Sequence, residues 1–383
     1  PFEEPGMGEI LRAELNDRFF PVSWDDISTE MLEDVENMII TIGIHELPFP
    51  KEADVSPLYS IIDEFGRLGV LEGGMVIVRP TLPIGTTDLL IGHIADSFGI
   101  EVGEDYNIAY VPERLMEGRA IVEERSLPKC IGAATDRCFS RASELFSNVG
   151  GEIIRMKDPK HAEFAKLIDN SWRHTRFAYS NDLAYVAEAE GLDVIETIES
   201  VNSGYSRNNI PLPGPVSGYC LGKDPIILEY SMNKVKERDS SVWISSLDSS
   251  HSLVQWVVNR VSGNKVLIAG TTFKEDIDDM RMSFSERLAI ALSDEGTSFD
   301  LLDPHISKNN YTMIWESIRS EFNGTVYNDV DKCLGDETYD TVIIAVRHKE
   351  FFEKEEKLSP HGVVIDLWNI YDGSLENRIG FGT

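Results

Sequence analysis

The sequence predicts an α/β protein in which two Rossmann-like, parallel-sheet domains are joined by a long central helix. Short apolar runs alternate with amphipathic stretches near both ends of the chain, which is typical of a parallel sheet with crossover helices. Between these regions, residues 159–190 keep helical spacing without an internal glycine or proline. The sequence contains no internal repeat and no low-complexity segment that would indicate another architecture.

The first alternating region contains three expected strands and two expected helices. Nearly continuous apolar runs predict buried strands at 36–43, 74–81 and 106–112. The amphipathic stretches 56–69 and 86–99 lie between these runs and predict the crossover helices. This order predicts a sheet with helices packed against both of its faces.

Residues 159–190 predict one helix about 48 Å long, at about 1.5 Å per residue. Alanine, leucine, phenylalanine, tyrosine and valine recur on it at helical spacing. Such a helix has more apolar surface than one short domain can cover. We therefore expect it to link domains and to form the basis of a homodimer or a larger homo-oligomer.

The second alternating region begins with an expected strand at 265–273. An expected helix at 285–296 follows, and further strands are expected at 298–304, 341–348 and 362–369. The repeated strand–helix order predicts a second parallel sheet.

The length of the chain indicates more than one domain, because 383 residues exceed what one ordinary hydrophobic core supports. The alternation of strands and helices stops after the first region and starts again near residue 265. We therefore expect three domains, at residues 1–155, 156–250 and 251–383.

The charge of the chain restricts its partners. Its net charge is −31, from 66 acidic and 35 basic residues, and the acidic residues are spread along the whole sequence. Such a surface indicates adaptation to salt or simple solubility. It repels the phosphates of nucleic acids and anionic membranes, so we expect neither as a partner. No apolar run reaches the roughly 18 residues that a membrane span needs.

The four cysteines are Cys130, Cys138, Cys220 and Cys333. Their positions show no CxxC or Cys/His ligand spacing, so we expect no metal site. So few cysteines in a long chain indicate free thiols in a reducing compartment, and we expect a cytoplasmic protein. Three of the four are expected to be small buried hydrophobic residues.

Cys220 needs separate treatment because it lies in GPVSGYCLGKDP, between a segment rich in glycine and proline and a Lys-Asp pair. One interpretation is another buried thiol. The other is a reactive thiol, since the glycines allow the backbone to approach a ligand closely and Lys223 can favour the thiolate. Asp224 can then hold a proton or a water molecule.

Two pairs of polar residues are further candidates for chemistry. Lys166 and Asn170 are four residues apart on the expected long helix, so they share one face and can reach one ligand; the alternative is a solvated helix face. Glu113 and Glu117 follow an expected strand at the end where open α/β sheets bind ligands. The alternative for this second pair is an acidic turn on the surface.

The segment 273–283, FKEDIDDMRMS, carries Lys274 and Arg281 just after the first strand of the second region. A pair of basic side chains suits a phosphate group. The alternative is a charged helix start, at which aspartate side chains cap free amides.

Taken together, these segments resemble the nucleotide-sugar 6-dehydrogenases, the family of the UDP-glucose, UDP-N-acetylmannosamine and GDP-mannose dehydrogenases. The resemblance covers nearly the whole chain. Six motifs occur in family order: PFEEPG, RPTLPIGTT, VPERLMEG, AEFAKLIDNSWR, PGPVSGYCLGKDP and GTTFKEDIDDMRMS. The stretch 206–228 looks most like the branch that acts on UDP-N-acetylhexosamines.

The resemblance implies an oxidation of the C6 hydroxyl of a UDP-sugar to the uronic acid, with NAD as the cofactor and a cysteine thiohemiacetal and thioester as intermediates. UDP-N-acetylmannosamine is the implied sugar, and UDP-glucose and UDP-N-acetylglucosamine are alternatives. The implied domains are NAD-binding, central with the cysteine loop and dimer contacts, and UDP-sugar-binding. Two other readings remain: a non-catalytic UDP-sugar binder, and a hydroxy-acid dehydrogenase, which needs no cysteine.

The resemblance also implies roles for individual residues. Catalytic roles are implied for Cys220, Lys166, Asn170, Asp224, Glu113 and Thr81. Cofactor contacts are implied for Thr81, Glu117, Lys223 and Arg281. Substrate contacts are implied for Glu113, Lys166, Asn170, Phe273, Lys274 and Arg207, the last of these reaching into a neighbouring subunit.

Several positions depart from the family pattern. Ser217 stands where a glycine is usual before the cysteine, and a side chain there is expected to crowd the loop or the substrate. Ile44 and His45 replace a Thr-Pro pair, and Pro80 replaces a serine, both near the cofactor. Trp368 stands where many members carry an arginine, and it is assigned no role.

The largest departure is the GxGxxG turn that holds the pyrophosphate of NAD in the family. This motif does not occur in the 383 residues. Two explanations are a fragment that lacks its first βαβ segment and a degraded homologue, and the intact chemical residues favour the fragment. The first domain is therefore expected to be truncated, and the activity of the chain as given is in doubt.

Overall fold

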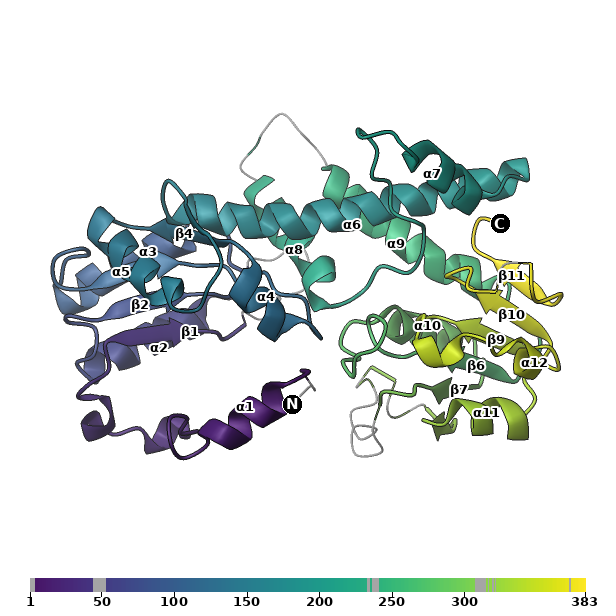
Figure 1. Cartoon of the computed structure of the whole chain (residues 1–383), viewed down its shortest axis with the longest axis horizontal. Coiled ribbons are helices and arrows are strands. Elements are labelled where there is room, and N and C mark those ends of the chain that lie inside the picture. The colour runs from purple at the N-terminus through teal and green to yellow at the C-terminus, as the bar shows by residue number, and fades with distance from the viewer. Residues whose placement is uncertain are drawn as a thin grey trace. The chain divides into compact units, whose positions relative to one another are not determined.

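The computed structural model describes residues 4–43, 53–232, 235, 241–306, 315, 317, 318, 320, 322–371 and 373–383. The chain forms two compact units, and each contains its own sheet (Figure 1). The first unit contains residues 4–170 and 226–232, and the second contains residues 171–225 and 241–383. The three-domain division at 155 and 250 stays a prediction.

The sheet of the first unit has five strands in the order β1-β2-β3-β4-β5. The strands are β1 (Asn37–Ile40), β2 (Met75–Val78), β3 (Asn107–Tyr110), β4 (Lys129–Ala133) and β5 (Ile153–Arg155). The three expected strands are confirmed as β1, β2 and β3, which are parallel. β4 was not expected, and it runs antiparallel to β3.

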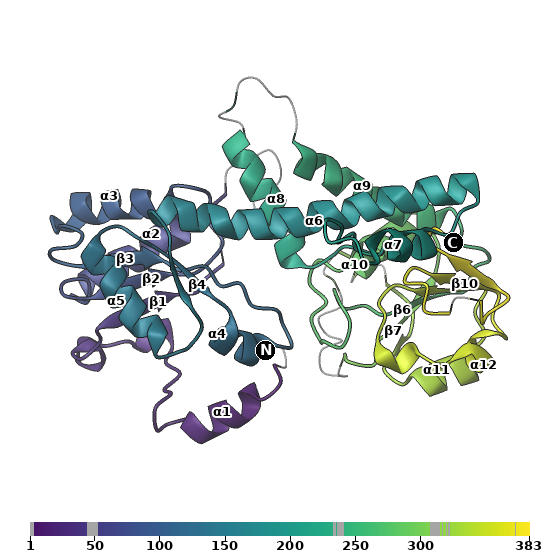
Figure 2. The same cartoon turned by 45° about the horizontal axis from the view of Figure 1, so that its top comes forward.

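Helices cover this sheet on both faces (Figure 2). They are α2 (Ser56–Arg67), α3 (Thr86–Phe98) and α5 (Asp136–Ser147). The short helix α4 (Ala120–Ser126) lies between β3 and β4 in the chain and buries no residue. Apolar side chains of α5, among them Phe146, pack on Met75 and Ile77 of β2. Because successive strand residues point to opposite faces, the equally buried Val76 and Val78 need cover on the other side, which α2 and α3 provide. These two helices confirm the prediction. An additional helix, α1 (Met7–Glu14), lies near the start of the chain.

The long helix α6 (Pro159–Glu190) has the bounds that the sequence predicts. It begins at a proline, a residue suited to the first helical turn, and it ends before Gly191, which has a φ of +65°. Glu163 anchors its first part, because the buried carboxylate accepts hydrogen bonds from the amides of Gly85 and Thr87 at 2.6 and 2.8 Å. Three helices follow: α7 (Val194–Asn202), α8 (Tyr219–Met232) and α9 (Val242–Val258).

The second unit has a six-stranded sheet in the order β11-β10-β9-β6-β7-β8, and all pairs are parallel. Its strands are β6 (Val266–Ala269), β7 (Phe299–Leu302), β8 (Val326–Tyr327), β9 (Thr341–Ile344), β10 (Val363–Asp366) and β11 (Arg378–Gly380). Its helices are α10 (Phe284–Asp294), α11 (Val330–Asp336) and α12 (Glu355–Leu358), with a 3-10 turn, η4 (Lys349–Phe351). The expected strands and helix are confirmed.

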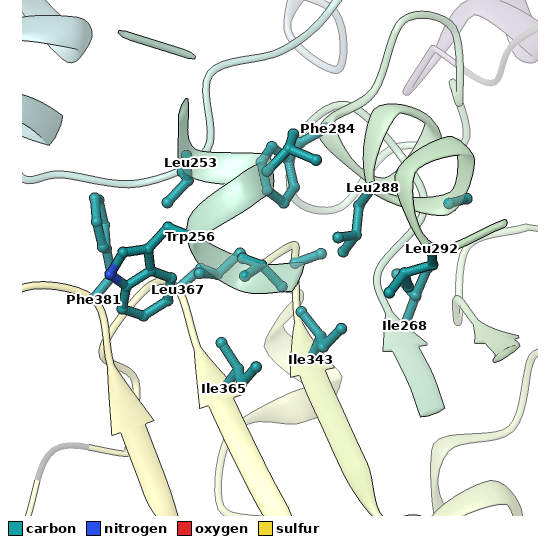
Figure 3. Packing of buried hydrophobic residues seen from close by; sticks show 14 of the residues in the cluster. Leu253, Trp256, Ile268, Phe284, Leu288, Leu292, Ile343, Ile365, Leu367 and Phe381 are labelled. Atoms are coloured by element: carbon teal, nitrogen blue, oxygen red, sulfur yellow. The ribbon is translucent and has the colours of Figure 1, made fainter. Parts of the chain in front are cut away.

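The core of the second unit lies on both faces of this sheet. On one face, Trp256 of α9 and Leu288 of α10 pack against Ile268 of β6 and its neighbours (Figure 3). On the other face, Leu267 of β6 packs against α11 and α12, where Leu334 is buried. This two-sided burial explains why the strands appear as continuous apolar runs.

Burial separates Cys220 from the other three cysteines. Cys130, Cys138 and Cys333 are buried, as expected, and Cys220 is exposed. The interpretation of Cys220 as a buried thiol is therefore wrong. Among the described residues, no helix combines the length and the apolar character needed to cross a membrane.

Candidate active site

The expected site residues form two groups, one in each compact unit. The group of the first unit lies at the carboxyl ends of β2 and β3 and on α6. The group of the second unit lies at the start of α8 and in the loop after β6. Each group is described by itself.

Lys166 and Asn170 form the part of the first group on α6. Both side chains are buried, at 5% and 1% exposure, so the reading of this pair as a solvated helix face is wrong. The ammonium of Lys166 donates a hydrogen bond to the main-chain carbonyl of Glu113. Because Glu163 fixes the preceding turn of α6, the amine is held at the loop that follows β3.

The loops after β2 and β3 carry the remaining residues of the first group. Thr81 is buried, just beyond β2. The amide of Glu113 approaches the carbonyl of Arg79 at 3.5 Å, and the hydroxyl of Tyr110 donates to the carbonyl of Pro80 at 2.8 Å. Pro80 thus supplies the acceptor that joins the two loops. The structure therefore brings Thr81, Glu113 and Lys166 to one edge of the sheet.

Glu117 lies in the turn before α4, next to a contact that explains the motif PFEEPG. The carboxylate of Glu4 accepts hydrogen bonds from the amides of Gly118 and Ala120, both at 2.7 Å. This motif therefore fastens the start of the described chain to the turn that carries Glu117.

The described part of this edge offers one hydroxyl donor suited to NAD, that of Thr81. The buried hydroxyl of Thr81 lies at the carboxyl end of β2, the end at which doubly wound sheets bind ligands. Gly43, beyond β1, has open space where a side chain would begin. Ile44 and His45, expected near the cofactor, lie outside the described residues. The glycine-rich turn for the pyrophosphate has no counterpart in the sequence.

The second group is centred on Cys220, which occupies the first turn of α8. Backbone amides at a helix N-terminus carry a partial positive charge, which favours a thiolate there. The thiol is exposed, so a substrate carbon can reach it. Such a position suits a nucleophile.

Lys223 and Asp224 lie in the next turn of α8 and are both buried. The ammonium of Lys223 lies 2.7 Å from a carboxylate oxygen of Asp224 and 5.0 Å from the ring centre of Tyr219. Burial by itself would lower the pKa of Lys223, but Asp224 and, to a smaller degree, Cys220 raise it above its usual value. Lys223 is thus a buried cation close to the thiol.

The residues before Cys220 are joined to the loop after β6. Gly218 has a φ of +95°, and its amide donates to the carbonyl of Met282 at 3.0 Å. The hydroxyl of Ser217 donates to the carbonyl of Phe273 at 2.8 Å. Ser217, expected to crowd the loop, instead forms a link between the cysteine segment and the segment of Phe273.

Two side chains that the sequence did not reveal hold the same segment: the buried Asn181 and the half-buried Arg287. The amide group of Asn181 donates to the carbonyl of Gly214 at 3.1 Å and accepts from its amide at 2.8 Å. The guanidinium of Arg287 donates to the carbonyl of Val216 at 2.7 Å. Asn181 is on α6 and Arg287 on α10, far from Cys220 in sequence, so no local motif could identify them.

Phe273, Lys274 and Arg281 lie on the loop between β6 and α10. Arg281 is exposed, and its guanidinium contacts both carboxylate oxygens of the buried Asp279, at 2.6–3.0 Å. Its guanidinium carbon lies 6.0 Å from the ring centre of Tyr219. The structure therefore places Arg281 of this loop near the start of α8.

Asp303 fixes the beginning of the same loop. Its carboxylate accepts hydrogen bonds from the amides of Thr271 and Thr272 at 2.6 and 3.2 Å, and it lies 3.2 Å from the Nε2 atom of His348. Burial would raise the pKa of Asp303, but His348 and the backbone amides lower it below its usual value. The signal in the sequence was that both residues lie at the carboxyl ends of expected strands, 298–304 and 341–348.

Arg207 and Trp368 complete the expected positions. Arg207 is exposed in the segment between α7 and α8, and its guanidinium lies over the ring of Tyr205 at 4.7 Å. Within the described residues, this ring contact keeps Arg207 with its own segment and not with the second group. Trp368, assigned no role, packs against Gly214, where an added Cβ would lie 2.7 Å from the indole.

Known protein families match most of the chain. Three models of the UDP-glucose/GDP-mannose dehydrogenase family match: the NAD binding domain at residues 1–150, the central domain at 160–248 and the UDP binding domain at 267–373.

Among curated relatives, the UDP-N-acetyl-D-mannosamine dehydrogenase of Escherichia coli is 31% identical over 313 residues, which is 75% of this chain and 70% of that protein. The enzyme of the same name from Methanocaldococcus jannaschii is 28% identical, over 86% of this chain and 74% of that protein.

Solved structures share the fold. The UDP-N-acetyl-mannosamine dehydrogenase Cap5O from Staphylococcus aureus matches with a TM-score of 0.79 and 25% identity, over 99% of this chain and 88% of that one. A UDP-glucose dehydrogenase from Pyrobaculum islandicum matches with a TM-score of 0.80 and 22% identity, over 100% and 87%.

Proposed function

Because the chain belongs to the UDP-glucose/GDP-mannose dehydrogenase family, we propose that it oxidises the C6 hydroxyl of UDP-N-acetyl-D-mannosamine to the carboxylate through a covalent intermediate on Cys220. The coarser activity, NAD-dependent dehydrogenation of a UDP-sugar, follows from the family and its NAD-binding and UDP-binding domains. The identity of the sugar and the role of each residue are the proposal.

The position of Cys220 is the observation that carries the proposal. It is the exposed thiol of the four, in the first turn of a helix and beside the buried pair of Lys223 and Asp224. A thiol adds readily to an aldehyde and leaves readily from a thioester, so it suits an oxidation that passes through an aldehyde. A simple alcohol dehydrogenase would not need it.

The reaction requires two hydride transfers and one hydrolysis. NAD, when bound, supplies the hydride acceptor for both transfers. The first transfer converts the C6 alcohol to an aldehyde, and the sulfur of Cys220 then adds to the aldehyde carbon. Loss of the second hydride leaves a thioester, and water cleaves the bond between sulfur and carbon. The products are the carboxylate, the free thiol, two NADH and three protons for each sugar.

Residues of the first group, together with Asp224 of the second, act on oxygen atoms in this scheme. Lys166 stabilises the oxyanion that develops at C6 and accepts a proton, with Asn170 as a second donor. The carboxylates of Glu113 and Asp224 orient or deprotonate the water of the hydrolysis step, and Thr81 helps to hold that water.

Binding roles complete the scheme. Phe273 and Lys274 contact the UDP-sugar. The hydrogen bond from Ser217 to the carbonyl of Phe273 joins their loop to the cysteine segment. The scheme assigns cofactor contacts to Glu117, Arg281 and Lys223. The scheme places Arg207 against the sugar nucleotide of a neighbouring subunit.

The sugar is proposed on two grounds. The stretch 206–228 is most similar to the branch that acts on UDP-N-acetylhexosamines, and the relatives named above from E. coli and M. jannaschii both bear the name UDP-N-acetyl-D-mannosamine dehydrogenase. UDP-glucose and UDP-N-acetylglucosamine remain the alternatives to compare in the assay.

A homo-oligomer built on α6 is also part of the proposal. Large apolar side chains are exposed along one helix: Phe164, Ile168, Trp172, Tyr179 and Val186. Their spacing of four or seven residues is that of a continuous helical stripe, and a second copy of the chain is the partner that a symmetric interface would supply. Cytoplasmic localisation stays a prediction from the free cysteines.

The test is the stoichiometry of NADH formed per UDP-sugar. We expect two NADH for each UDP-N-acetyl-D-mannosamine, and slower turnover with UDP-glucose, UDP-N-acetylglucosamine and GDP-mannose. Cys220→Ser should reduce turnover by about 10³-fold or more while UDP-sugar binding changes little. Lys166→Ala should slow turnover with a modest loss of binding. Unchanged two-NADH turnover in Cys220→Ser would eliminate the proposed intermediate.

The lack of a GxGxxG turn in the 383 residues favours one competing function, a UDP-sugar binder without turnover. Selective alkylation separates the two, because Cys220 is the exposed thiol. The proposal expects UDP-N-acetyl-D-mannosamine to protect Cys220 from iodoacetamide and NADH to accumulate when NAD is added. Protection without any NADH would support the binder.

A further inference from the structure

Three loops of the second unit bring nitrogen and oxygen ligands together. Asp276 follows β6, His305 follows β7, and His348 and Glu350 follow β9. These strands are parallel neighbours in the order β9-β6-β7, so their carboxyl ends meet at one edge of the sheet. One ligand atom from each of the four residues lies within 4.8 Å of the others.

The distances suit a small divalent ion. The Nε2 atom of His305 lies 3.2 Å from a carboxylate oxygen of Glu350 and 3.4 Å from one of Asp276. A tetrahedral ion with bonds of about 2.0 Å holds its ligand atoms about 3.3 Å apart. Two pairs of ligand atoms, His305–Glu350 and His305–Asp276, therefore already have the separation that such an ion requires.

His348 is prepared as a ligand by Asp303. The imidazole is fully buried, and its Nε2 atom lies 3.2 Å from the carboxylate of Asp303. A proton held on Nε2 by that carboxylate leaves the lone pair on Nδ1, an arrangement common behind metal-bound histidines. Nδ1 accepts from the amide of Asp276 at 3.0 Å. An ion bound at Nδ1 takes the place of this hydrogen bond.

We propose that Asp276, His305, His348 and Glu350 bind a divalent transition-metal ion of the zinc class. Two imidazoles favour such an ion over magnesium or calcium, which prefer oxygen ligands alone. Two carboxylates balance the charge of the ion. No short ligand motif marks this site, because the four positions come from three loops separated by more than twenty residues each.

The ion would brace the loop between β6 and α10. Asp276 is only two residues from Lys274, and Thr272 contacts His348 at 3.2 Å. An ion held at His305 and Glu350 therefore limits the movement of the segment that carries Phe273 and Lys274. This consequence rests on the proposed function, whereas the site itself does not, since it is tested by binding and not by turnover.

The experiment is a zinc titration of the untagged, chelator-treated chain in competition with a chromophoric chelator. The Cys220→Ser background removes the exposed thiol as a competing ligand. We expect one zinc equivalent, a rise in the thermal midpoint on zinc addition, and no saturable binding of magnesium. His305→Ala and Glu350→Gln should each weaken zinc binding at least about tenfold, and Asp303→Asn by about 10- to 100-fold.

His161→Ala is the matched control, because His161 forms an exposed pair with Asp158 at 2.7 Å elsewhere on the chain; it should leave zinc binding unchanged. Melting curves without zinc show whether each variant folds, and Glu350→Gln serves where His305→Ala does not. Two results would overturn the site: no saturable zinc binding up to about 1 mM, or equal zinc affinity in the parent and in a folded Glu350→Gln or His305→Ala variant.

Discussion

A methyl group added at Gly218 would test how the cysteine segment depends on Phe273. The residue has a φ of +95°, and a Cβ there would lie 2.7 Å from the Cδ2 atom of the Phe273 ring. Gly204 offers a matched control, with a φ of +67° and no atom within 4 Å of the added Cβ. Both Gly→Ala changes strain the backbone. Only the methyl group added at Gly218 would clash with a neighbouring side chain.

The two costs can be worked out separately. A left-handed conformation costs an alanine about 1–2 kcal/mol, which is the expected loss of unfolding free energy for Gly204→Ala. Non-bonded carbons prefer a separation of about 3.5 Å or more, so the ring of Phe273 must retreat by roughly 0.8 Å. Overpacking of this kind adds about 1–3 kcal/mol, and Gly218→Ala should therefore lose roughly 2–5 kcal/mol in total.

Activity should fall as well, because Cys220 lies two residues after Gly218. A misplacement of about 1 Å at a reacting group costs about 10²-fold in rate. Urea unfolding followed by tryptophan fluorescence measures the first effect, and NADH formation measures the second. Gly204→Ala should keep most of its activity.

The double variant Gly218→Ala/Phe273→Ala isolates the contact. With the ring removed, the extra cost of Gly218→Ala over Gly204→Ala should disappear from the unfolding free energy. Equal losses for Gly218→Ala and Gly204→Ala in the presence of the ring would refute the reasoning.

Three further predictions concern the second unit and α6. Burial lowers the pKa of His174 from 6.5 to about 4. Between these two pH values the folded state therefore binds fewer protons than the unfolded state. The free energy of unfolding should fall by about 1.4 kcal/mol for each pH unit as the pH is lowered from 6.5 to 4. His174→Gln should flatten that part of the urea-unfolding profile. Asn181→Ala leaves both backbone groups of Gly214 without their partner and should cost about 2–4 kcal/mol, against less than about 0.5 kcal/mol for the exposed Asn148→Ala. Trp172→Arg places a charge in the apolar stripe and should lower the mass found by light scattering.

Each of these predictions has an outcome that contradicts it. Parallel pH profiles for the parent and His174→Gln would show that His174 is protonated alike in both states. Similar losses for Asn181→Ala and Asn148→Ala would remove Asn181 from the support of the cysteine segment. A monomer at micromolar concentration for the parent chain would remove the interface on α6 and the role of Arg207 in a neighbouring subunit.

The ends of the expected strands show where sequence reasoning loses precision. The apolar run at 265–273 predicted a strand of that length, and β6 ends at Ala269. The remaining residues form a loop whose amides bind the carboxylate of Asp303. Apolar periodicity records burial, and buried loop residues have the same composition as buried strand residues. The bounds of α6 were predictable because helix-breaking residues flank it.

Strand direction and the structure around Cys220 were equally outside the reach of local patterns. β4 pairs antiparallel with β3, and a strand buried on both faces looks the same in either direction. The segment expected as a cysteine loop begins a helix instead, although Pro225 lies inside it. Gly218 and Ser217, just before that helix, contact the loop after β6, which lies more than fifty residues away in sequence.

The sequence by itself determined the fold class, the two sheets, the long helix and the family, because these depend on periodicity and on motifs read in order along the chain. It also identified Cys220 and Lys166 as candidates. Only the tertiary structure decided that Cys220 is exposed, that Lys166 is buried against the Glu113 carbonyl, and that Asn181 and Arg287 hold the cysteine segment. The four residues of the proposed metal site come together for the same reason: parallel strands that are distant in sequence end at one edge of a sheet, and no local pattern records which strands are neighbours.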